Sequence, residues 1–201
     1  YDISKIDFEK LKKEFERSPK KNTTVQSFKD AIQRKLELML RQNPLRTDFQ
    51  RHYEELVAGY NSEKDAVNIE KTFAALLVLA DELDKEQQRA VRDGLTEETQ
   101  ALFDLLMKPD LEKADIKRLK SVAVGLYEAL QAQIESMQDF AAKQATRARI
   151  RVTIRDYLWD ESKGLPESYG EPEVDERTDA VFAHLVMQAR QAGANRGSMT
   201  Q

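Results

Sequence analysis

The sequence has no cysteine and contains little glycine or proline. Among 201 residues there are 7 Gly and 5 Pro, together half of the ~12% that these two residues usually contribute. Without cysteine the chain has no disulfide framework, no thiolate nucleophile and no Cys-ligated zinc or iron–sulfur site. This absence excludes small secreted disulfide scaffolds and predicts a protein of a reducing compartment, the cytoplasm.

Long hydrophobic runs are also missing. The longest apolar run ends at Ala80 and is far shorter than the ~20 residues that cross a bilayer. The N-terminus lacks the basic-then-apolar order of a signal peptide. We therefore expect a soluble protein with no membrane association. The first residue is Tyr1 instead of Met, which predicts a fragment of a longer chain.

The charged residues form four blocks of alternating sign. The net charge is -4, yet the blocks carry +5 (residues 1–46), -9 (47–115), +5 (116–155) and -5 (156–201). Such a pattern indicates either contact with other charged macromolecules on separate faces or pairing of the blocks with one another. Both interpretations are kept.

Apolar residues recur at helical spacing along almost the whole chain. This periodicity predicts an all-α fold, an irregular bundle of about seven to nine helices. Residues 1–192 are expected to form a single helical domain, with a subdivision near 61–68 as the alternative, and 193–201 a frayed tail. Asn43-Pro44 should end one helix, because the residue before proline is pushed out of the helical region.

Several residues are typical of helix ends. Thr47 and Gln50 have the spacing of a capping box, and Thr96 is followed by an acidic first turn. Gly94 suits a left-handed position after a helix. Asp110 or Asp115 is expected to cap the next helix, which is predicted to extend as far as Phe140.

The segment 149–155 is compatible with two structures. Its strict alternation of polar and apolar residues is the period of a half-buried strand. As a helix, it would place Ile150, Ile154 and Leu158 on one apolar stripe, with arginines along the flank. The sequence offers no second convincing strand to pair with, so we favour the helix.

No motif predicts catalysis. There is no Gly-rich phosphate loop, no paired histidine on one helix face and no Gly-x-Ser-x-Gly elbow. His52 and His184 lie in different predicted helices and are expected to be packing or surface residues. We therefore expect no catalytic residue, no small-molecule substrate and no cofactor.

One pattern imitates a metal-dependent nuclease. Asp110, Asp115 and Lys117 follow the order in which carboxylates hold Mg²⁺ and a lysine assists the attacking water. Here, however, the carboxylates precede an apolar helical repeat, the position of capping residues. We expect capping and no metal site.

The clearest local feature is basic. Lys143 and four arginines (Arg147, Arg149, Arg151, Arg155) occur without an acid between Asp139 and Asp156. Guanidinium groups suit both phosphates and carboxylates, so this stretch could contact DNA or an acidic protein surface. The slightly favoured alternative is pairing with carboxylates of this chain, for example those of the acidic 47–115 block. Aromatic residues interleaved as in single-strand binding are missing.

Three segments together resemble a known family. They are 41–49 (RQNPLRTDF), 94–98 with 103–106 (GLTEE, FDLL) and 146–155 (TRARIRVTIR). They resemble, in the right order, the C-terminal helical domain of the restriction (R) subunit of type I restriction-modification enzymes. The resemblance extends from about Ile6 to Phe182, and the loop 164–172 and the tail do not contribute to it.

The resemblance implies a role and a partner. In that family the R subunit combines an endonuclease domain, two helicase-type ATPase domains that use ATP and Mg²⁺, and this helical region. It implies a non-catalytic fragment of a larger multidomain subunit, which docks the motor onto the methyltransferase core of modification and specificity subunits. The alternative is a module that contacts duplex DNA and guides it at the motor. Our candidate contact residues, which the family does not assign, are Arg147, Arg149, Arg151 and Arg155, then Arg41 and Arg46.

Overall fold

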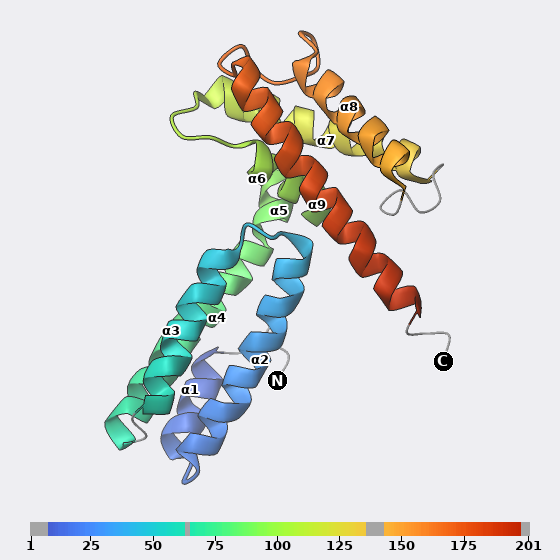
Figure 1. Ribbon diagram of the computed structural model, residues 1–201. Coiled ribbons are helices and arrows are strands. Elements are labelled where there is room, and N and C mark those ends of the chain that lie inside the picture. The colour runs from blue at the N-terminus through green and yellow to red at the C-terminus, as the bar shows by residue number, and fades with distance from the viewer. Residues whose placement is uncertain (1–7, 63–64, 136–142, 198–201) are drawn as a thin grey trace. The chain divides into compact units, whose positions relative to one another are not determined.

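The structure, a computed structural model, describes residues 8–62, 65–135 and 143–197, and these are helical with no strand (Figure 1). The predicted all-α fold is confirmed. The helices are α1 (Phe8–Arg17), α2 (Lys21–Gln42), α3 (Thr47–Ser62), α4 (Ala66–Gln87), α5 (Arg89–Asp93), α6 (Glu97–Leu106), α7 (Lys113–Glu135), α8 (Gln144–Trp159) and α9 (Glu171–Gly197).

The chain forms two compact units, Tyr1–Gly94 and Leu95–Gln201. Each has its own hydrophobic cluster. The sequence predicted one domain with an alternative division near 61–68, and that segment lies inside the first unit, between α3 and α4. The division falls instead after Gly94, whose φ of +71° follows the short helix α5.

In the first unit, α2 packs against α3 and α4, and α1 packs against α2. Their apolar faces meet in a core in which the rings of Phe15 and Phe73 stack with centroids 3.7 Å apart. The side chain of Asp65 accepts a hydrogen bond from the Asn68 N–H at 2.7 Å and so caps α4. The fully buried large side chains of this core are Phe28, Ile32, Leu36, Met39, Leu76, Leu79 and Leu83.

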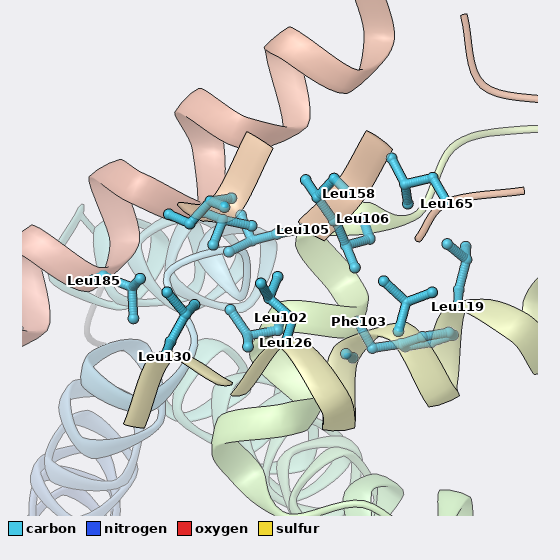
Figure 2. Packing of buried hydrophobic residues seen from close by; sticks show 14 of the residues in the cluster. Leu102, Phe103, Leu105, Leu106, Leu119, Leu126, Leu130, Leu158, Leu165 and Leu185 are labelled. Carbon is cyan, nitrogen blue, oxygen red and sulfur yellow. The ribbon is translucent and has the colours of Figure 1, made fainter. Parts of the chain in front are cut away.

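In the second unit, α6 packs against α7 and α9, α7 against α8, and α8 against α9. Figure 2 shows leucines of α6, α7, α8 and α9, with Leu165 of the α8–α9 loop, in one cluster. The segment 149–155 belongs to α8, as predicted, and the stripe Ile150, Ile154 and Leu158 is buried.

Some helix ends agree with the sequence prediction. Helix α2 stops at Gln42, directly before Asn43-Pro44. Gly94 is left-handed, and Thr96 caps α6 in a capping box formed with Thr99. These ends depend on short-range chemistry, which sequence patterns report directly.

Other ends differ from the prediction. Thr47 is the first residue of α3, and the Gln50 amide donates to Glu54 at 2.6 Å instead of returning to Thr47. Helix α7 begins at Lys113, so Asp115 lies within its first turn and not at the cap, while Asp110 precedes the helix with a φ of +62°.

At the C-terminal side, two predictions meet the limits of the described residues. Helix α9 continues to Gly197, so residues 193–197 of the predicted frayed tail are helical. The predicted continuation of α7 to Phe140 lies outside the described residues.

Candidate docking surface

Two arginines of α8 form ion pairs with α9. Arg151 lies 2.7 Å from the Asp179 carboxylate. Arg155 donates through Nε to Asp175 at 2.7 Å and through Nη2 to Glu171 at 3.0 Å. The hydrogen bond to Asp179 and its charge raise the pKa of Arg151. Arg151 and Arg155 therefore fasten α8 to α9.

Pairing of charge blocks occurs within each unit. The acids that meet Arg151 and Arg155 come from the 156–201 block and not from the 47–115 block named as the example. The reason is topological, because the loop after Trp159 returns the chain antiparallel to α8 and lays acidic α9 against it (Figure 1). The first unit does the same, since basic α2 and the turn after it meet acidic α4 in the pairs Lys21–Glu70, Lys35–Asp84 and Arg46–Glu86.

The other two arginines of α8 are not used in this way. Arg149 is exposed and Arg147 half-exposed, and neither guanidinium makes a hydrogen bond or ion pair with a side chain that the structure describes. Helical spacing places Arg149 away from the buried stripe, whereas Arg147 is on its flank. Of the four candidate arginines, Arg151 and Arg155 thus pair with α9, whereas Arg147 and Arg149 pair with no described carboxylate. A contact of any of them with a partner stays a prediction.

The solvent-facing side of α8 combines apolar residues with few charges. Val152 and Trp159 are 56% and 50% exposed, and seven-residue spacing puts them on one face. We define the α8 outer face by its exposed residues Ala145, Ala148, Arg149, Val152, Asp156 and Trp159. Clustered exposed apolar residues with a polar border are typical of protein interaction sites.

Arg46 and Arg41 differ in burial. Arg46 is only 4% exposed, and its guanidinium contacts Glu86 at 3.1 Å and the Met39 carbonyl oxygen at 3.5 Å. It therefore stabilises the turn between α2 and α3. Arg41 is exposed, and its Nε donates to the Glu37 carbonyl oxygen, one turn earlier, at 3.3 Å.

The residues of the nuclease-like pattern have other positions. Asp115 accepts a hydrogen bond from the Ser168 hydroxyl at 2.8 Å, and Asp110 is exposed in the turn before α7. Within the described ranges, no three His, Cys, Asp or Glu side chains come together as a metal site. Over the same ranges, no helix has the length and apolar character needed to cross a membrane.

The two histidines lie in different environments. His52 is exposed on α3. His184 on α9 is 4% exposed, and its Nδ1 atom has no hydrogen-bond partner among the residues that the structure describes. Burial lowers the pKa of His184. Its position matches the predicted packing role.

The loop between α8 and α9 was expected from its turn residues, but its contacts with the rest of the unit were not predicted. Asp160 accepts hydrogen bonds from the N–H groups of Ser162 and Lys163 at 2.9 and 3.0 Å. From α7, Arg118 donates to the carbonyl oxygens of Gly164 and Glu161 at 2.9 and 2.8 Å. The loop is therefore fastened to α7 through its backbone.

The second half of the loop is fastened to the core. The Tyr169 hydroxyl is buried and donates to the Leu106 carbonyl oxygen at 2.7 Å, and burial raises the pKa of Tyr169 to about 12. Lys108 binds the Glu173 carboxylate at 2.8 Å and the Ser168 carbonyl oxygen. These contacts give the α8–α9 loop one defined shape.

Beside this loop lies an open pocket of about 360 Å³. Trp159, the single tryptophan of the chain, lines it at the C-terminal end of the α8 outer face. The sequence signal that could have indicated this pocket is Trp159 followed by glycines and prolines between 164 and 172. The lining residues are Arg118, Leu158, Trp159, Asp160, Glu161, Leu165, Pro166, Glu167, Tyr169 and Val174.

Comparison with known proteins identifies the family. Residues 1–191 match the family described as type I restriction enzyme HindI endonuclease subunit-like, C-terminal. The match includes the α8–α9 loop, on which the sequence resemblance did not rest. No curated protein and no solved structure matches the chain. The chain therefore belongs to the family of C-terminal regions of type I restriction enzyme HindI endonuclease subunit-like proteins.

Proposed function

We propose that this chain is a non-catalytic assembly module. It docks the ATP-dependent motor of the restriction subunit onto the methyltransferase core formed by modification and specificity subunits. ATP and Mg²⁺ act in other domains of that subunit. The observation that carries the proposal is the α8 outer face, where Val152 and Trp159 are half exposed or more beside Arg149. Exposed aromatic, aliphatic and arginine side chains are the residues that dominate protein interfaces.

A docking module at a motor must transmit force, and the second unit has the stiffness for this. The buried stripe of α8 joins the main cluster, and Arg151 and Arg155 tie its flank to α9. A partner bound on the outer face of α8 would therefore pull on a helix anchored on two sides. Force that the motor exerts on DNA would then be transmitted to the core instead of being lost in a flexible connection.

Contact with duplex DNA is the alternative function. It requires arginines that are free for phosphates, yet Arg151 and Arg155 already face carboxylates. Binding through several phosphates would make the affinity fall steeply with salt. The α8 outer face also carries Asp156, which repels phosphate. Protein docking is therefore favoured.

The test uses the complete restriction subunit with purified modification and specificity subunits. We expect Arg149→Glu with Val152→Asp to weaken assembly tenfold or more, on the order of one interface hot spot. The matched control is Arg34→Glu with Val78→Asp, an exposed pair in the first unit. Dissociation constants from analytical ultracentrifugation provide the measurement.

Two results would contradict the proposal. If a subunit without this region assembled as tightly as the intact one, the region would have no docking role. The Arg149→Glu, Val152→Asp variant of the complete subunit could instead assemble normally but lose its salt-dependent affinity for duplex DNA. In that case contact with DNA, and not docking, would be the function of this region.

A further inference from the structure

We propose that the pocket beside the α8–α9 loop binds an arginine side chain of a partner protein. The pocket has a shape suited to one long side chain. Its volume of about 360 Å³ is near the lower end of the ~300–1,000 Å³ range of ligand sites. Trp159, Leu165 and Pro166 line its apolar part. The Trp159 side chain is 50% exposed at this pocket.

The charge around the pocket selects a cation. The lining contains one basic residue, Arg118, and three acids, Asp160, Glu161 and Glu167. Arg118 uses its Nε and Nη2 atoms on loop carbonyl oxygens. Asp160 is already bound within the loop, because its carboxylate accepts hydrogen bonds from Ser162 and the Lys163 N–H, which lower its pKa, and lies 3.9 Å from the Lys163 ammonium group. The charge that faces a ligand therefore comes from Glu161 and Glu167.

Two of these acids are available to a ligand. The carboxylates of Glu161 and Glu167 are exposed and have no hydrogen bond or ion pair with a described side chain. Removing a phosphate from water beside the two carboxylates of Glu161 and Glu167 is unfavourable. The pocket therefore discriminates against nucleic acid and favours a basic group.

Arginine fits better than lysine. A guanidinium can stack on the indole face of Trp159 and donate two parallel hydrogen bonds to a carboxylate at the rim. Its aliphatic stem can lie against Leu165 and Pro166. The Arg155 guanidinium of this chain already lies 5.9 Å from the Trp159 ring centroid, so a partner's guanidinium would have to use the part of the ring that stays exposed.

The loop is prepared for binding before a partner arrives. Arg118 and the Tyr169 hydroxyl fix its backbone, and Gly164 fits where no larger residue can. A surface that is already ordered loses little conformational entropy on association. Together, a rigid loop, an exposed tryptophan and unpaired acids form a socket for a basic anchor residue.

The first experiment measures occupancy of the socket directly. Trp159 is the single tryptophan of the 201-residue chain, so its fluorescence reports on the pocket. The probe is an acetylated Ala-Arg-Ala amide, with the citrulline peptide as its uncharged control. We expect a saturable change with the arginine peptide alone, reduced at least tenfold in apparent affinity by Glu161→Gln with Glu167→Gln.

The matched control for this variant is Glu55→Gln with Glu98→Gln, which removes two exposed carboxylates elsewhere. It should bind the arginine peptide like the unchanged chain. Equal responses to the arginine and citrulline peptides would overturn the proposal that the pocket binds arginine. An unchanged affinity in the Glu161→Gln, Glu167→Gln variant would overturn it as well.

The second experiment identifies the partner and rests on the proposed docking function. In the complete subunit, Glu161→Gln with Glu167→Gln should weaken assembly with the methyltransferase core tenfold or more. If deletion of the region abolishes assembly but this variant assembles normally, the core is not the arginine donor and docking stands. If deletion leaves assembly intact, docking fails, and the fluorescence titration still decides the pocket.

Discussion

Arg46 lies in the turn after α2 and is 4% exposed. Its guanidinium contacts the Glu86 carboxylate and the Met39 carbonyl oxygen. Arg41, five residues earlier, is exposed. An exposed charge remains hydrated when its partner is removed, whereas a buried one loses both water and partner. Burial, and not residue type, therefore determines what each arginine contributes.

Replacing Arg46 with alanine should destabilise the first unit by about 2–3 kcal/mol, below the usual cost of breaking a buried pair because Arg89 also reaches Glu86. Arg41→Ala, the control, should change the free energy of unfolding by less than about 0.5 kcal/mol. Urea denaturation followed by circular dichroism measures both. Equal effects would show that the Arg46 contacts contribute no more than a surface arginine.

His184 should make the stability of the second unit depend on pH. Burial lowers its pKa in the folded chain from 6.5, so below that pH the unfolded chain binds a proton that the folded chain refuses. Stability should therefore be full above pH 6.5 and fall as the pH drops through it.

The variant His184→Leu should weaken this dependence between pH 7.5 and 5.5, because it removes the group that titrates differently in the two states. His52→Gln, which removes the exposed histidine of the first unit instead, is the control. Thermal unfolding across this range is the measurement. An identical slope in His184→Leu would assign the pH dependence to other groups.

At the scale of elements, the backbone of the α8–α9 loop is so closely packed at Gly164 that no side chain fits there. A Cβ on Gly164 would lie 2.5 Å from the carbonyl oxygens of both Leu158 and Asp160. These backbone atoms are held by neighbouring hydrogen bonds and cannot withdraw freely. The loop shape thus depends on one residue without a side chain.

Gly164→Ala should destabilise the second unit by roughly 1–3 kcal/mol, the cost of a forced close contact. Gly59→Ala is the matched control, since a Cβ there meets nothing within 4 Å. It should stabilise α3 by about 0.5–1 kcal/mol, because glycine is a poor helix residue. Differential scanning calorimetry measures both, and a neutral Gly164→Ala would indicate a loop that relaxes without cost.

Across the whole molecule, the charge blocks change sign three times, and each of the two units pairs basic side chains with an acidic helix. Lys35 and Arg46 meet α4 in the first unit, and Arg151 and Arg155 meet α9 in the second. Of the two interpretations of the blocks, pairing accounts for these arginines and lysines. Contact with another macromolecule remains for the exposed Arg149.

Local chemistry made much of the fold predictable. The ends of α2 at Gln42 and of α5 at Gly94 depend on neighbours a few residues away, and the apolar stripe of α8 is visible as periodicity. The start of α7 was predicted at the wrong residue, because Asp115 was taken for a helix cap. Its carboxylate instead accepts a hydrogen bond from the hydroxyl of Ser168, 53 residues later. An acidic residue near a helix start looks the same in sequence whether it caps or binds a distant loop.

By itself the sequence determined that this protein is all-α, rich in charged residues and free of cysteine chemistry, because helical periodicity and composition are local properties. Only the tertiary structure decided which arginines are already paired and where a pocket opens. Arg151 is bound because the α8–α9 loop brings Asp179 to it, whereas Arg149 lies on the exposed side of α8 and pairs with no carboxylate in the described ranges. Glu161 and Glu167 become a rim beside Trp159 only because Arg118 holds the loop backbone there. These arrangements depend on contacts between residues far apart in the chain, which periodicity does not contain.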